Sequence, residues 1–124
     1  MKSDITNSED VKLLVDSFYD KVKVNPEIGF IFSDVAKVNW EHHLPKMYEF
    51  WSAILIGGPP YGGNPMSAHI QLSKQTPMGE KEFSAWLSIF NETMDELFEG
   101  PNATEGKSRA ANIAGVMLYK IQTS

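Results

Sequence analysis

The chain contains no cysteine. This absence excludes disulfide bonds, iron–sulfur clusters, thiolate-bound or covalently attached haem, and zinc sites built on cysteine. Any transition metal would have to be held by His, Met, Tyr or carboxylate side chains. Clusters of basic residues are absent too, and the formal net charge is -5. This charge balance argues against nucleic acid or an anionic membrane as a partner.

Long hydrophobic runs are also absent. The first ten residues, MKSDITNSED, are polar and lack the apolar segment of a signal peptide. The longest apolar stretch, FWSAILIGG over residues 50–58, is too short to span a bilayer. We therefore expect a cytoplasmic protein. The length of 124 residues and the 42% hydrophobic content predict a single domain over residues 1–124.

The apolar residues recur at spacings of three and four, which is the pattern of amphipathic helices. The pattern predicts four helices: one after an N-cap at Asn7, one from about Trp40 to Leu55, one from about Glu80, and one after residue 101. Asn102, with Glu105 three residues later, predicts a capping pair for the last helix. No stretch alternates with period two for long enough to form a strand, so the predicted fold class is all-α.

Residues 57–64, GGPPYGGN, form a loop by composition. Asn64 and Pro65 then predict the start of a short helix that ends near residue 72.

Two histidines stand side by side in the stretch WEHHLPKMYEFW. Adjacent residues on a helix differ by about 100° in direction, so His42 and His43 cannot face the same way. From His43, steps of four and seven reach Met47 and Phe50, whereas the same steps from His42 reach charged side chains. Helix phase therefore predicts that His43 points into the protein and His42 points to solvent.

The third histidine, His69, lies on the predicted short helix beyond the Gly/Pro loop. Two inward histidines on successive helices could face each other across a flat, apolar ligand. Zinc or copper between His43 and His69 would lack further ligands, and no Glu-x-x-His pair supports a di-iron site. Haem needs only one imidazole, an apolar slot and a few polar groups. Either histidine could also be a hydrogen-bonded core residue with no ligand.

Four segments in this order, FYDKV, WEHHLPKMYEFW, YGGNPMSAH and FSAWLSIF, resemble the truncated haemoglobins. The chain is most similar to the bacterial group III branch, from about residue 8 to about residue 120. The resemblance implies a shortened globin fold, in which two helix pairs form a two-over-two sandwich around haem b.

The resemblance also implies roles for single residues. His69 is similar to the proximal histidine that binds the haem iron. Tyr19 and His43 match the distal tyrosine and histidine, and Trp86 matches the tryptophan that closes the distal pocket. Phe32 is similar to the phenylalanine that wedges against the haem face.

The remaining matches are weaker. The following side chains fall at positions that line the pocket: Phe18, Met47, Phe50 and Phe83. Lys46 and Tyr61 are candidate partners of the haem propionates. Each aromatic side chain among these matches could instead be an ordinary core residue.

Two function classes stay open at this point. In the first, the protein binds diatomic gases (O₂, CO and NO), and Tyr19 and Trp86 donate hydrogen bonds that hold O₂ tightly. In the second, it is a redox enzyme that acts on nitric oxide or peroxide with an external reductase. A haem-free globin-like module would be expected to lack His69.

Overall fold

The computed structural model describes residues 2–31, 40–58 and 79–123. These residues form four helices and no strand: α1 (Ser8–Val24), α2 (Trp40–Leu55), α4 (Glu80–Leu97) and α5 (Pro101–Thr123). The all-α prediction is confirmed. The loop predicted over residues 57–64 is described only as far as residue 58, and the short helix predicted after it lies outside the described residues.

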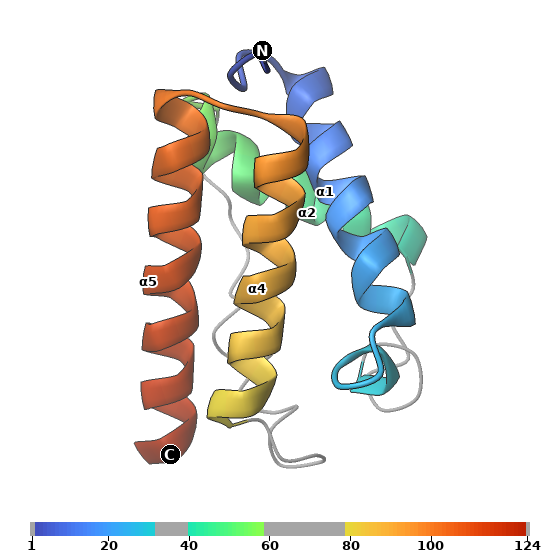
Figure 1. Ribbon diagram of the computed structural model, residues 1–124, viewed down its shortest axis with the longest axis vertical. Coiled ribbons are helices and arrows are strands. Elements are labelled where there is room, and N and C mark those ends of the chain that lie inside the picture. Colours follow the sequence, from blue (N-terminus) through green and yellow to red (C-terminus); the bar gives the residue numbers. More distant parts are fainter. Residues whose placement is uncertain (1, 32–39, 59–78, 124) are drawn as a thin grey trace.

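The helices are arranged as two pairs (Figure 1). In one pair α4 and α5 lie side by side along the long axis of the molecule, and in the other α1 packs against α2. The pairs are joined because α1 also contacts α4 and α2 also contacts α5. This is the predicted two-over-two arrangement of helices. None of the helices in the described residues is long and apolar enough to cross a membrane.

Helix α1 begins where the sequence predicts. The side chain of Asn7 accepts a hydrogen bond from the backbone N–H of Asp10 at 2.9 Å. This bond satisfies one of the N–H groups that a helix start leaves unpaired. The buried stripe of α1 follows the predicted spacing and consists of Val11, Leu14, Val15, Phe18, Tyr19 and Val22.

An ion pair at the surface links α1 to α4. The ammonium nitrogen of Lys21 lies 2.6 Å from a carboxylate oxygen of Glu96 and 3.6 Å from one of Glu92. Exposed ion pairs of this kind contribute little to stability, on the order of 0–1 kcal/mol. The apolar stripes of the two helices therefore contribute most of the free energy that holds them together.

Helix α5 approaches α4 and α2 closely at Gly106. A Cβ atom at this position would lie 2.7 Å from the terminal methyl carbon of Met94 and 3.0 Å from a methyl carbon of Leu55. The missing side chain thus allows α5 to pack against both helices. Ala110, Ala114 and Met117 continue the buried side of α5 at the predicted spacing of three and four residues.

The start of α5 is capped by a residue near the other end of the sequence. The carboxylate of Asp4 accepts hydrogen bonds from the backbone N–H groups of Asn102 and Ala103, both at 2.9 Å. The side-chain amide of Asn102 donates to the carbonyl of Ile5 at 2.7 Å. The N-terminal segment is thereby fixed across the end of the α4–α5 pair.

The predicted capping pair of Asn102 and Glu105 is therefore wrong. Helix α5 begins at Pro101, one residue earlier, so Asn102 already lies inside the helix. Glu105 instead pairs with Arg109 one turn later, at 3.0 Å. Gly100 makes room for the actual cap: its φ is +149°, and a Cβ there would lie 2.5 Å from Cγ of Asp4.

Replacing Asp4 by Ala should lower the free energy of unfolding by about 0.5–2 kcal/mol, the usual effect of losing a helix N-cap. Urea denaturation at neutral pH measures this difference. The matched control is Asp20→Ala, at an exposed position of α1, which should change stability by no more than about 0.5 kcal/mol. Equal effects of the two substitutions would contradict the capping role.

The effect of Asp4→Ala should also depend on pH. Burial alone would raise the pKa of Asp4, but hydrogen bonds from the N–H groups of Asn102, Ala103 and Ile5 lower it below its ordinary value of 3.8. The stabilisation is therefore fully present above that value and is lost as the carboxylate becomes protonated at lower pH. Denaturation curves at decreasing pH should show the wild type approaching the variant in stability.

Candidate functional site

Tyr19 of α1 and His43 of α2 face each other across the interface between these helices. Their ring centroids lie 5.2 Å apart at an interplanar angle of 81°. Tyr19 is 5% exposed, and the Nε2 atom of His43 is buried. His43 therefore points inward, as helix phase predicts. The side chain of His42 is not among those that the structure describes.

Trp40 completes a triangle of rings with this pair. Its ring centroid lies 5.3 Å from that of Tyr19 and 5.6 Å from that of His43. Edge-to-face and tilted contacts at these distances are favourable, because the positive edge of one ring meets the negative face of another. Sequence reasoning missed Trp40. The signal was available, since Trp40 precedes His43 by three residues and shares its side of α2.

The contact between Tyr19 and His43 depends on how α1 and α2 are aligned. One turn before Tyr19, the Asp16 carboxylate accepts a hydrogen bond from the hydroxyl of Tyr48. The ammonium group of Lys12 lies 5.8 Å from the centroid of the Tyr48 ring. These contacts help to fix the alignment of the two helices next to the Tyr19–His43 contact.

Phe18, the neighbour of Tyr19 in sequence, faces α4 instead of α2. Its ring makes edge contacts with Trp86 at 5.7 Å and with Phe90 at 5.6 Å. Trp86 and Phe90 stack on each other at 5.9 Å with an angle of 18°. Phe18 thus separates two polar-tipped aromatic residues, since it contacts Tyr19 on one side at 4.9 Å and Trp86 on the other.

A further ring contact leads from α4 back to α2. Trp51 stacks on Phe90 at 4.7 Å and 27°, and both side chains are almost fully buried. Ring contacts therefore connect α2 to α1, α1 to α4, and α4 to α2 again. Such a closed set fixes the relative positions of three helices more firmly than any single contact, because one ring cannot move without displacing its neighbours.

The site offers hydrogen-bond donors in apolar surroundings. A tyrosine hydroxyl is protonated at neutral pH and can donate, and burial raises the pKa of Tyr19 further. Trp86 is half-buried, and its indole N–H is a donor only. His43 adds an imidazole, which can donate or accept. A donor is worth more in such surroundings than in water, because water competes less for the acceptor.

The other predicted site residues are placed as follows. Met47 and Phe50 are half-buried on α2 and pack against the main core. Phe83 is buried near the start of α4, in a smaller cluster with Ala114 and Met117. Lys46 is exposed on α2.

Three predicted site residues, Phe32, Tyr61 and His69, lie outside the described residues. Within the described parts of the chain, no group of three or more His, Asp or Glu side chains could hold a metal ion.

Comparison with known proteins gives consistent matches over nearly the whole chain. The family model described as bacterial-like globin matches residues 3–118. The group 3 truncated hemoglobin of Campylobacter jejuni is 30% identical over 126 residues, which cover 97% of each chain.

Solved structures agree in fold. The group III truncated hemoglobin from Campylobacter jejuni matches with a TM-score of 0.83 at 27% identity, over 98% of this chain and 95% of that chain. The group II truncated hemoglobin from Bacillus anthracis matches with a TM-score of 0.73 at 25% identity, over 90% of this chain and 85% of that chain.

Replacing Tyr48 by Phe should remove the hydrogen bond to Asp16 and lower the free energy of unfolding by about 1 kcal/mol. A hydrogen bond to a charged group contributes about 1.5–3 kcal/mol, and we expect less here because Asp16 is exposed. Urea denaturation of the variant and the wild type at pH 7 measures the difference. No loss of stability would mean that this contact does not align α1 with α2.

The same comparison at alkaline pH tests the environment of Tyr48. Burial first, and then the hydrogen bond to Asp16 and its negative charge, raise the pKa of Tyr48 from 10.0 to about 12. The stabilisation is therefore complete below pH 10 and is lost as the pH rises through 12. The stability difference between wild type and Tyr48→Phe should shrink over this range.

Proposed function

Since the chain belongs to the truncated haemoglobin family, we propose that it holds haem b and binds O₂ and other diatomic gases at the haem iron. Tight hydrogen bonding from the distal side of the pocket would distinguish it from a protein that releases O₂ rapidly.

The observation that carries this proposal is the contact between Tyr19 and His43, with Trp86 on the other side of Phe18. These three polar-tipped rings come from three different helices. Tyr19 and His43 are in contact, Phe18 lies between Tyr19 and Trp86, and the side chains packed around them are apolar. The resemblance to the family matched the same three residues to its distal positions.

The residues present fit a haem group. A porphyrin needs a flat apolar slot, and Phe18, Met47, Phe50 and Phe83 supply apolar side chains on three helices. Its gas ligand needs a few hydrogen-bond donors on one side, which Tyr19, His43 and Trp86 can supply. In the absence of cysteine, histidine is the residue best suited to hold the iron, and His69 is our candidate.

When bound, haem supplies an iron atom with a coordination position at which O₂, CO or NO can bind. The chain's own residues then decide how long the gas stays. The Tyr19 hydroxyl and the Trp86 indole N–H would donate hydrogen bonds to the outer atom of the gas ligand. A tyrosine hydroxyl is protonated near neutrality, and burial raises the pKa of Tyr19 further, so this donor does not depend on pH in that range.

The first test concerns haem uptake. Replacing His69 by Ala should abolish saturable haem binding at micromolar haem, because the chain would lose its iron ligand. Absorption titration of the purified protein measures the uptake. His42→Ala is the control, since helix phase places His42 on the solvent face, and it should bind haem normally. A normal Soret band and CO complex in the His69 variant would overturn the assignment.

The second test concerns Tyr19 as a donor. Tyr19→Phe removes only the hydroxyl, so a lost hydrogen bond of about 1.5–3 kcal/mol should raise the O₂ off-rate by roughly tenfold to a hundredfold. The CO off-rate should rise less, because CO carries less negative charge on its outer atom. Stopped-flow ligand replacement measures both rates.

Tyr119→Phe is the matched control for this test, because Tyr119 is 65% exposed near the end of α5. The same loss of a hydroxyl there should leave both off-rates unchanged. If O₂ and CO speed up by the same factor in Tyr19→Phe, the tyrosine acts through the shape of the pocket and not as a donor.

A further inference from the structure

Helices α1 and α2 make side-chain contacts along their interface that run in opposite chain order. Three of these contacts occur in order: Asp16 with Tyr48, Tyr19 with His43, and Lys23 with Trp40. The Tyr19–His43 contact thus has a polar contact on each side. The Asp16–Tyr48 contact lies in the middle of the interface. The Lys23–Trp40 contact lies at the end where α1 finishes and α2 begins.

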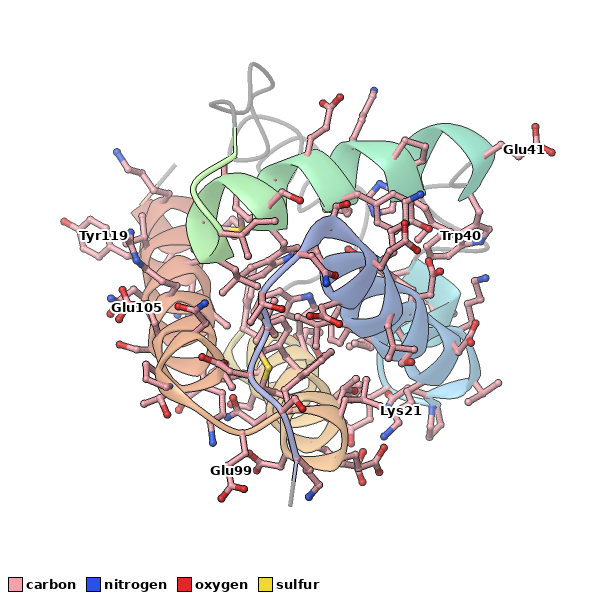
Figure 2. The ribbon with its side chains drawn as sticks, turned by 90° about the horizontal axis from the view of Figure 1, so that it is seen from above. Lys21, Trp40, Glu41, Glu99, Glu105 and Tyr119 are labelled. Atoms are coloured by element: carbon pink, nitrogen blue, oxygen red, sulfur yellow. The ribbon has the colours of Figure 1, made fainter. Side chains whose placement is uncertain are left out.

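The last contact is a cation–π interaction. The ammonium nitrogen of Lys23 lies 4.5 Å from the centroid of the Trp40 ring, well within the distance at which a cation is attracted to the face of an indole. Lys23 is exposed in the last turn of α1, and Trp40 is the first residue of α2. Figure 2 shows Trp40 turned toward α1, whereas its neighbour Glu41 extends away from it.

Trp40 connects this surface contact to the pocket. The same indole that lies below Lys23 is in ring contact with both Tyr19 and His43. A shift of Trp40 would therefore displace both rings. Lys23 itself is exposed at the end of α1.

The first turn of α2 has a particular need for such an anchor. Pro45 lies inside α2 and has no N–H, so the backbone hydrogen bond that would tie position 45 to the carbonyl of Glu41 is missing. His43 lies in this turn. With one backbone bond fewer, side-chain contacts contribute more to holding this turn in place, and those of Trp40 are among them.

We propose that Lys23 and Trp40 are positioning residues that hold His43 against Tyr19 and thereby set the distal hydrogen-bonding geometry. This inference rests on the proposed function for its effect on gas binding, but the positioning itself is a property of the protein without haem. Neither residue touches the gas ligand in this proposal; both act through His43 and Tyr19, the two rings that Trp40 contacts.

The first experiment uses the haem-free protein and aromatic ¹H–¹³C NMR spectra. The variant Lys23→Met keeps a long, unbranched side chain and removes only the charge. It should shift the ring resonances of His43, which are assigned by their disappearance in His43→Gln. The matched control is Lys107→Met, because the ammonium group of Lys107 contacts Asp95 at 2.7 Å between α5 and α4, away from the interface of α1 with α2.

The expected result is a shift of the His43 resonances in Lys23→Met and none in Lys107→Met. Unchanged His43 resonances in Lys23→Met, or equal shifts in both variants, would overturn the proposal. Trp40→Phe retains an aromatic face for Lys23 and should perturb His43 less than Trp40→Leu. Equal perturbation by the two would also contradict the role of the ring face.

The second experiment uses the haem-loaded protein. Lys23→Met should change the O₂ off-rate by about twofold to fivefold, the factor that corresponds to an exposed cation–π interaction. In a His43→Leu background the same substitution should have a smaller effect, because only Tyr19 remains of the two rings that Trp40 contacts. A change of the same size in that background would show that Lys23 acts by another route.

The two experiments separate the failure of this inference from the failure of the proposed function. If the wild-type chain does not take up haem, the proposed function is wrong, yet the NMR comparison still decides whether Lys23 and Trp40 position His43. If haem binds normally and the NMR spectra show no effect of Lys23→Met, only the positioning role is wrong.

Discussion

The structure depends on one geometric constraint: two neighbouring aromatic residues of α1 must contact two different helices. A helix turns by about 100° per residue, so Phe18 is directed toward α4 while Tyr19 is directed toward α2. Both side chains are buried. Helix α1 can satisfy both contacts only if it lies between α2 and α4, and this position produces the two-over-two arrangement of the helix pairs.

The same constraint brings the candidate site together. Because Tyr19 faces α2 and Phe18 faces α4, His43 and Trp86 are held on opposite sides of the same turn of α1. Stacking of Trp51 on Phe90 then joins α2 and α4 beyond this turn. The rings that stabilise the core are thus also the rings that position the polar groups, so the fold and the site cannot be varied independently.

Much of the fold could be predicted from the sequence, because its helices carry strong local signals. The N-cap at Asn7 and the bounds of α2 were predicted correctly. The inward direction of His43 followed from helix phase despite Pro45. Local signals failed at the start of α5, where Asn102 and Glu105 looked like a capping pair. Asp4 caps this helix instead, and a partner 98 residues away leaves no local pattern.

The site was less predictable than the fold for a related reason. Tyr19, His43 and Trp86 were named individually, but their spatial relation depends on Phe18 and on the alignment of α1 with α2. Trp40 was missed because an aromatic residue at the start of an amphipathic helix is ordinarily part of the core. Its contact with Lys23 pairs residues from two different helices, so periodicity within one helix does not reveal it.

The most direct test of the account is a titration of the haem-free protein with haem, followed by absorption and by tryptophan fluorescence. If the rings of α1, α2 and α4 form a haem pocket, fluorescence quenching and the Soret band should both saturate at one haem per chain. The reduced complex should then give a sharp CO spectrum. A folded protein that shows no saturation, or that takes up haem without quenching its tryptophans, would contradict the account.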